Sequence, residues 1–299
     1  AHTRASIWSA KGEHEPALRE AQRAIALLPG DDLEAVDIRN TIGMIHSARG
    51  NYAEAEKAHR DVLARRRVSL GEGHPKIADS LDNLGVVRFH QGAYAEARKA
   101  YEQALALRVA VLGAGHRDVG TSHNNLGGLL MDTGDVKGAA EHLEAALRIY
   151  ESRLGPDHGN LAIPLSNLGE LATRRGDFSE AIRYCNRALA LDEATAPDDP
   201  QLAYDLVCVG EAHLGLGSFA AARTALERAL QIREASEGDA GELARTRFGL
   251  ARALWRDGSA TDRTRAQTLA TAARDGFAKA GDGWRARHAE ATAWLAAPR

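Results

Sequence analysis

The sequence contains one tripeptide that could belong to a catalytic site, His116-Arg117-Asp118. In a phosphotransfer catalytic loop these residue types supply an aspartate that acts as the base, and an asparagine five residues later binds a metal ion. Here His123 occupies the asparagine position. The sequence also lacks the glycine-rich loop, the strand lysine and the Asp-Phe-Gly motif of such enzymes. Asp177-Phe178-Ser179 matches only the first two residues of that motif. We therefore predict that this segment is not an enzyme and has no catalytic residues.

The other residues with metal, phosphate or nucleophile chemistry lack the spacing that these sites need. The 12 histidines include no His-x3-His pair. Gly71-x-Gly73 and Gly113-x-Gly115 have no third glycine and no Gly-Lys-Ser/Thr continuation, so they do not form a phosphate loop. The sequence also has no Gly-x-Ser-x-Gly elbow for a nucleophile. We expect no cofactor and no bound metal.

Charge and composition exclude further classes of protein. The 299 residues include 38 Lys and Arg against 41 Asp and Glu, a net charge of -3, which argues against nucleic acid as the partner. No apolar run approaches the ~18 residues of a membrane span, so we expect no membrane insertion by this segment. Two cysteines, Cys185 and Cys208, are too few for a disulfide framework, and they predict reduced, buried thiols in a cytoplasmic protein. The chain does not begin with Met, so we expect a longer protein. The sequence leaves open whether a membrane helix lies upstream and places this segment outside the cytosol.

One glycine recurs at a nearly constant interval. Gly50, Gly92, Gly134 and Gly176 are 42 residues apart, and Gly217 and Gly258 follow at steps of 41. Each lies between two segments of helical period, where the first helix needs a left-handed C-terminal residue. Small residues lie seven positions before this glycine and alanines five positions after it: Gly43, Gly85, Gly127, Gly169 and Gly210, then Ala55, Ala97, Ala139, Ala181 and Ala222. The rows predict repeated pairs of antiparallel helices that cross too closely for a β-carbon on the first helix.

The repeated pair resembles the tetratricopeptide repeat (TPR), with Leu-Gly in its first helix and Ala in its second. The usual repeat has 34 residues. The extra residues here extend the second helix and add a loop, seen at residues 70–75, 112–116 and 154–158 as Leu-Gly-x-x-His. This loop resembles the kinesin-light-chain type of the repeat, and His116 belongs to it. The resemblance implies an all-α fold, a right-handed α-solenoid of about seven repeats.

The repeat pattern divides the chain into seven repeats and a C-terminal cap. The last repeats, around Phe248–Trp255 and Arg265–Phe277, also resemble the C-terminal repeat region of bacterial serine/threonine protein kinases. That resemblance implies a kinase domain upstream of this segment. Residues 282–299 are predicted to form a capping helix with a polar face, which the exposed end of a solenoid requires. The TPR array covers 1–281, with repeats at approximately 1–33, 34–75, 76–117, 118–159, 160–199, 200–239 and 240–281.

The resemblance implies a concave groove lined by the first helix of each repeat. Two adjacent positions of these helices are rich in asparagine, although asparagine is a poor residue for a helix interior. A carboxamide has a donor and an acceptor, as a peptide unit has. We predict that the groove grips an extended peptide through these positions and the polar residues around them: Asn40, Asp82, Asn83, Asn124, Asn125, Asn167, Glu170, Arg174, Tyr204 and Glu211. The alternative is that the asparagines cap or brace neighbouring helices.

These features predict a protein-protein interaction module that serves as the recruitment or regulatory region of a larger bacterial signalling protein. The alternative is a structural spacer that associates with itself and leaves the groove empty. Kinesin-light-chain relatives are known for a basic groove that takes acidic, Trp-containing peptides. That pattern is not evident here, because Asp37, Asp79 and Asp82 make the amino-terminal half acidic, and Arg66 and Arg108 are expected to be exposed.

Overall fold

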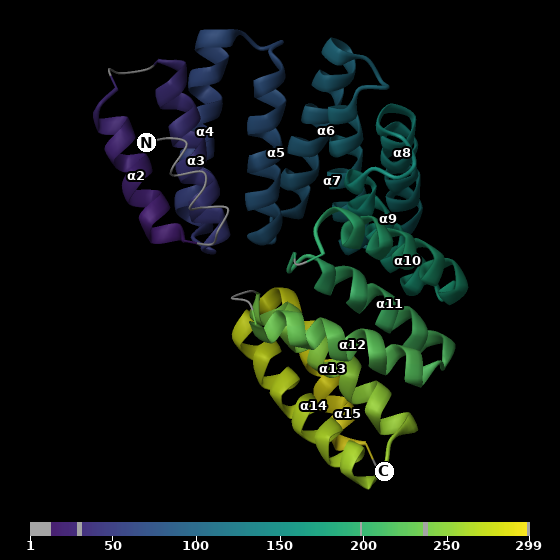
Figure 1. The fold of residues 1–299 in the computed structure, drawn as a ribbon. Coiled ribbons are helices and arrows are strands. Elements are labelled where there is room, and N and C mark those ends of the chain that lie inside the picture. The colour runs from purple at the N-terminus through teal and green to yellow at the C-terminus, as the bar shows by residue number, and fades with distance from the viewer. Residues whose placement is uncertain (1–12, 29–31, 198, 236–238, 298–299) are drawn as a thin grey trace. The chain divides into compact units, whose positions relative to one another are not determined.

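The computed structural model describes residues 13–28, 32–197, 199–235 and 239–297. These residues form α-helices and two short 3-10 helices and contain no strand, which confirms the all-α prediction (Figure 1). The beginning of the predicted first repeat, residues 1–12, lies outside the described residues. The helices form two compact units that divide between Ile149 and Tyr150.

The first unit consists of helical pairs joined by short loops. From α2 to α7 each helix packs against the next one along the chain, and α3 also contacts α5, as α5 contacts α7. Gly127 of α7 lies against Leu143 of α8. The long second helices begin directly after the loop glycine and the residue that follows it. The helices of this unit are α2 (His14–Ala26), α3 (Leu33–Ala48), α4 (Tyr52–Leu70), α5 (Pro75–His90), α6 (Tyr94–Leu112), α7 (Arg117–Asp132) and most of α8 (Val136–Leu154).

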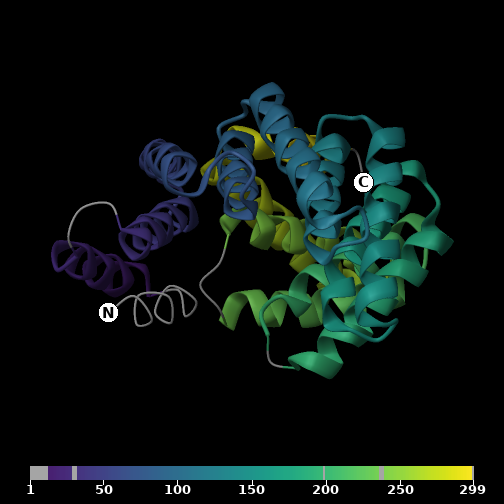
Figure 2. The same cartoon turned by 90° about the horizontal axis from the view of Figure 1, so that it is seen from above.

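The second unit continues the same pattern. Its core contains alanine, leucine and valine, with Phe248 and Phe277 buried near its carboxyl-terminal end. Figure 2 shows its green and yellow helices packed against one another. Its elements are η1 (Gly159–Leu161), α9 (Ala162–Arg175), α10 (Phe178–Thr195), α11 (Leu202–Leu216), α12 (Phe219–Ala235), α13 (Ala240–Asp257), α14 (Ala260–Ala280), η2 (Asp282–Trp284) and α15 (Arg285–Ala296).

The recurring loop glycine is left-handed in five repeats and extended in one. Gly50, Gly92, Gly134, Gly176 and Gly217 have φ between 74° and 86°, as the sequence predicts. Gly258 has φ -100° and ψ 159°, so the prediction of a left-handed residue is wrong there. The reason lies in the next helix: Ser259 and Asp262 form a capping box at the start of α14, and the chain enters that box in an extended conformation.

The mid-helix glycines make room for a large side chain from the second helix of the same pair. A β-carbon on Gly85 would lie 2.4 Å from the ring of Tyr101, and one on Gly127 would lie 2.7 Å from Cγ of Leu143. Gly210 and Leu226 repeat the arrangement at 2.5 Å. The close crossing predicted from the glycine row is therefore present. In these pairs the side chain that needs the space stands four residues after the alanine that follows the loop glycine by five positions.

The two neighbouring glycines of α7 provide a direct test of this crossing. We expect Gly127→Ala to lower the free energy of unfolding by about 1–3 kcal/mol, because Leu143 must shift away from the new methyl group. Gly128→Ala is the matched control: its β-carbon would meet nothing within 4 Å, so the better helix propensity of alanine should raise stability by up to about 1 kcal/mol. Urea denaturation followed by circular dichroism measures both changes. Equal effects of the two substitutions would contradict the crossing.

The two cysteines are joined, so the prediction of reduced thiols is wrong. Cys185 of α10 and Cys208 of α11 form a disulfide with their Cα atoms 5.7 Å apart, within the usual range. A β-carbon on Gly169 would lie 2.5 Å and 2.8 Å from the two sulfur atoms. The glycine of α9 thus leaves the space in which the two side chains meet. Their sequence separation of 23 residues gave no indication that they face each other.

Candidate functional site

The ten predicted groove residues lie on the first helices of the pairs, five in each unit. In the first unit α3, α5 and α7 carry them, and in the second unit α9 and α11. Asp82 is buried and Tyr204 is exposed, and most of the others are partly buried. The arrangement within each unit shows what these side chains contact.

The asparagines of the first unit contact neighbouring helices. Asn83 Nδ2 donates a hydrogen bond to Asn40 Oδ1 at 2.9 Å, which links α5 to α3. Asn125 of α7 lies near the carboxyl group of Asp82 on α5, where burial raises the pKa of Asp82 to about 6 and Asn125 acts to lower it. These contacts correspond to the bracing role that the sequence left open. A peptide bound at these carboxamides would have to use their remaining donors and acceptors.

The acidic residues of the first unit are paired with arginines from the second helices. Arg66 of α4 is 4% exposed; its Nη2 lies 2.8 Å from Asp37 Oδ1 and its Nη1 lies 2.8 Å from Ser80 Oγ. Lys76 Nζ approaches the other oxygen of Asp37 at 2.7 Å. The expectation that Arg66 is exposed is wrong. Its guanidinium lies between two first helices, α3 and α5, and contacts a polar side chain on each of them.

Arg108 repeats this arrangement one repeat later. It is 5% exposed on α6, and its Nη2 donates to Asp79 Oδ1 at 2.7 Å. Its Nη1 donates to Asp82 of α5 and, at 2.5 Å, to Ser122 Oγ of α7. Arg108 is therefore buried, contrary to expectation, and Asp82 is occupied by an internal ion pair. The acidic character that the sequence indicated for this half is largely neutralised from within.

An arginine that the sequence interpretation missed organises the charges of the second unit. Arg245 of α13 contacts Glu211 of α11 with Nε at 3.0 Å and with Nη2 at 2.5 Å, and its Nη2 lies 3.7 Å from Glu170 Oε2 of α9. Burial acts to raise the pKa of Glu211, but the Arg245 guanidinium outweighs it and lowers that pKa to about 2. The same carboxylates raise the pKa of Arg245 well above its ordinary value. Two of the predicted groove residues, Glu170 and Glu211, are thus held by Arg245.

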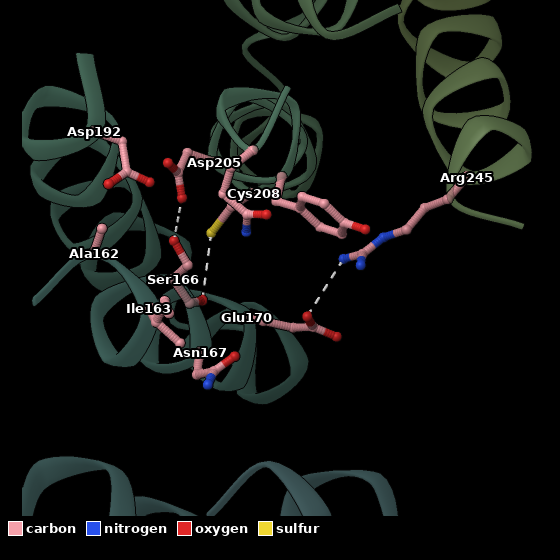
Figure 3. A pocket seen from close by; sticks show the side chains of 11 residues that line it. Ala162, Ile163, Ser166, Asn167, Glu170, Asp192, Asp205, Cys208 and Arg245 are labelled. Atoms are coloured by element: carbon pink, nitrogen blue, oxygen red, sulfur yellow. Dashed lines mark hydrogen bonds and ion pairs between the residues drawn. The ribbon is translucent and has the colours of Figure 1, made fainter. Parts of the chain in front are cut away.

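Beside this cluster the second unit contains a cavity of about 110 Å³ between α9, α10, α11 and α13 (Figure 3). Three of the predicted groove residues line it. Figure 3 shows Asp192, Asp205 and Ser166 on one side of the cavity and the Glu170–Arg245 pair on the other. The full lining is Ala162, Ile163, Ser166, Asn167, Glu170, Asp192, Gln201, Tyr204, Asp205, Cys208 and Arg245.

Two carboxyl groups in this cavity lie close together. Asp205 is 2% exposed and accepts a hydrogen bond from Ser166 Oγ, whereas its buried Oδ2 makes no hydrogen bond with the described residues. Burial raises the pKa of Asp205 to about 7, and the nearby Asp192 carboxylate adds to the effect. Burial also raises the pKa of Asp192. The pair offers oxygen acceptors to a ligand that brings hydrogen-bond donors.

The sequence interpretation did not include Asp192 or Asp205. Asp192 stands 84 residues after Arg108, two repeat lengths, so the repeat pattern was the signal that could have singled it out. In the described part of the chain no group of three or more His, Cys, Asp or Glu could hold a metal ion. None of the described helices has the length and apolar character needed to cross a membrane.

Comparisons with known proteins agree with the geometry of the helical pairs. The family model of the tetratricopeptide repeat matches residues 34–110 and 118–194, together more than half of the chain. No curated protein sequence matches the chain.

Similar solved structures share the fold at low sequence identity. BtubC (BKLC) from P. vanneervenii is 22% identical over 75% of this chain and 89% of its own, with a TM-score of 0.59. A Podosopora anserina protein of nearly identical TPR-like repeats, named for the kinesin light chain, is 20% identical over 71% of this chain and 100% of its own, with a TM-score of 0.55. A Rap protein in complex with Competence and Sporulation Factor is 18% identical over 94% of this chain and 80% of its own, with a TM-score of 0.66.

Proposed function

Because the chain belongs to the tetratricopeptide repeat family, we propose that it acts as an interaction module and binds a peptide or a segment of a partner protein along the first helices of its repeats. The observation that carries the proposal is the cavity of the second unit, which Asn167, Glu170 and Tyr204 line. The resemblance to the tetratricopeptide repeat predicted Asn167 as a groove residue, and Glu170 and Tyr204 as polar residues near it. Repeat proteins present extended surfaces of this kind to their partners.

The similar Rap protein supports the proposal by analogy. It has the same fold and was solved in complex with Competence and Sporulation Factor. A chain of such helical pairs therefore holds a ligand in that protein. The identity of the ligand does not carry over to this chain at 18% sequence identity.

Several finer predictions from the sequence remain predictions. They include the bacterial signalling context, the upstream kinase domain, the boundaries of the seven repeats with a separate cap, and self-association in place of ligand binding. The cytoplasmic location is a further one. The disulfide argues against it, because disulfides persist mainly in oxidising compartments.

Peptide selection followed by substitution tests the proposed surface. A phage-displayed library of 12-residue peptides is selected on the purified chain, and the selected peptides are measured by fluorescence anisotropy. We expect the triple variant Asn83→Ala, Asn125→Ala, Asn167→Ala to bind them at least tenfold more weakly, since each lost hydrogen bond costs roughly 0.5–1.5 kcal/mol.

The control changes three exposed residues of second helices, Gln103→Ala, Glu144→Ala and Arg183→Ala, and should leave binding unchanged. Equal binding by both triple variants would show that the peptides do not use the predicted surface. Failure to select any peptide, together with dimerisation in a sedimentation series, would favour the spacer alternative.

A further inference from the structure

The position of Asp192 in the repeat pattern is occupied by a buried arginine in two earlier repeats. Arg66, Arg108, Tyr150 and Asp192 follow one another at steps of 42 residues on successive second helices. Arg66 and Arg108 both place their guanidinium between the first helix of their own pair and the first helix of the next pair. In the fifth repeat an acidic residue stands where the second and third repeats have an arginine and the fourth has a tyrosine.

The contacts of Arg108 define which residues surround this position. Its guanidinium bonds Asp82 and Asp79, which lie 26 and 29 residues earlier on α5, and Ser122, which lies 14 residues later on α7. Arg66 uses the same pattern with Asp37, 29 residues earlier, and Ser80, 14 residues later. The site is therefore built the same way twice within the first unit.

The equivalent residues around Asp192 all line the cavity of the second unit. Ser166 and Ile163 lie 26 and 29 residues before it on α9. Asp205 lies 13 residues after it on α11, where the loop glycines step by 41 in place of 42. The cavity thus forms where an arginine side chain lies in the first unit, because the shorter Asp192 side chain does not fill that space.

The charges of this cavity are placed differently from those around Arg108: Ser166 and Ile163 stand where Asp82 and Asp79 bind the guanidinium, and the carboxyl group of Asp205 stands where Ser122 lies. Asp205 replaces a serine, so two carboxyl groups surround the space where the guanidinium would lie. Asp205 Oδ2 is buried without a hydrogen bond to the described residues. The charged groups that act most strongly on Asp205 are the carboxylates of Asp192 and Glu193. Arg245, across the cavity, is already engaged by Glu211 and Glu170.

We propose that this cavity binds the guanidinium group of an arginine from the partner segment, which would occupy the place that the side chain of Arg108 occupies in the first unit. The arginine donates to Asp205 Oδ2 and to the carboxylate of Asp192, and Ser166 Oγ offers a further acceptor. The planar fork of donors in a guanidinium suits two facing carboxylates better than the single ammonium of lysine does. This inference rests on the proposed function and assigns the side chain that the partner presents.

Blocked amino acids probe the cavity independently of any longer peptide. Nα-acetyl-arginine methylamide is titrated into the full chain, and amide shifts in the NMR spectrum report binding; the neutral isostere Nα-acetyl-citrulline methylamide is the control ligand. We expect the citrulline derivative to bind at least tenfold more weakly, because its neutral ureido group keeps the hydrogen-bond donors but lacks the positive charge that pairs with the carboxylates. The lysine derivative should fall between the two.

Three variants locate the binding site. Asp205→Asn keeps the shape and removes the charge, so we expect at least tenfold weaker binding of the arginine derivative. Asp192→Arg introduces the residue type of Arg66 and Arg108, and the new guanidinium would fill the cavity. We expect this variant to fold, to have a higher thermal midpoint than the native protein, and not to bind the arginine derivative. Glu180→Gln removes one negative charge, as Asp205→Asn does, but at another position of the unit, on α10. It should leave binding of the arginine derivative unchanged.

Equal binding of the arginine and citrulline derivatives, or unchanged binding by Asp192→Arg, would overturn the inference. Asn83 and Asn125 do not line this cavity, so binding of the probe does not depend on them, whereas Asn167 is part of the lining. A failure of the peptide selection with intact arginine binding would therefore count against the proposed function alone. A failure of arginine binding with intact peptide binding would count against this inference alone.

Discussion

Replacing Arg245 by methionine is expected to lower the free energy of unfolding by about 3–5 kcal/mol at neutral pH. Arg245 is the shared partner of Glu211, Glu170 and Glu242, at distances of 2.5 Å, 3.7 Å and 3.8 Å. Methionine fills much of the space but leaves these partly buried carboxylates without their central cation, which is the costly way to break a buried pair. Urea denaturation followed by circular dichroism measures the change.

The pH dependence of this effect distinguishes lost charge pairing from lost packing. Burial acts to raise the pKa of Glu211, but Arg245, with smaller contributions from Arg287 and Arg252, lowers it from 4.5 to about 2. A lowered carboxylate pKa contributes stability that is present in full above 4.5 and is lost as the pH falls toward 2. We therefore expect the difference between the native protein and Arg245→Met to shrink as the pH is lowered from 7 to 3. A difference that stays constant would point to packing.

Arg174→Met is the matched control for this substitution. Arg174 contacts Glu170 at 2.8 Å within the same helix, but its side chain is 40% exposed. An exposed pair of this kind contributes less than about 1 kcal/mol. If Arg174→Met and Arg245→Met have the same small effect, the charge cluster around Arg245 does not stabilise the second unit.

Reduction of the Cys185–Cys208 disulfide is expected to lower the free energy of unfolding by about 2–4 kcal/mol. The bond joins α10 to α11 across 23 residues of sequence and so restricts the unfolded chain. The midpoint of urea denaturation, measured with and without a phosphine reductant, gives the change. Mass spectrometry of the untreated protein should show the loss of two hydrogen atoms.

The double variant Cys185→Ala, Cys208→Ala is the control for the effect of the reductant itself. Its midpoint should be lower than that of the oxidised protein and should not respond to the phosphine. Two thiols that react in the unfolded, unreduced protein would contradict the disulfide. So would a midpoint that does not depend on the reductant.

Features that depend on one helical pair were predictable from the sequence. The close approach at Gly127 was one, because the two helices of a pair are joined by a short loop and their contacts recur every 42 residues. The left-handed loop glycines were another, and Gly258 is the exception because the capping box of Ser259 sets the backbone there. Local geometry and a repeated pattern suffice for such features.

Features that depend on three helices were not predictable. Arg66 and Arg108 were expected in solvent, and Cys185 and Cys208 were expected as separate thiols. In each of these cases a side chain reaches from a second helix to the first helix of the next pair. Residue type and periodicity do not predict whether a side chain contacts the next helical pair, because a long arginine side chain suits an exposed helix end as well as a buried ion pair.

The amino-acid sequence by itself determined the repeated helical pairs, since these follow from periodicity. Its resemblance to the tetratricopeptide repeat indicated the family and the helices that carry the polar positions. Only the tertiary structure decided which of the polar side chains at those positions already form ion pairs within the protein. It showed that Asp82 is paired with Arg108, that Glu211 is paired with Arg245, and that the space beside Asp192 is a cavity. The physical reason is that burial and ion pairing depend on the distances between side chains of packed helices. The repeat pattern places Asp192 at the position of Arg108, but only the packed helices show that the exchange leaves a cavity.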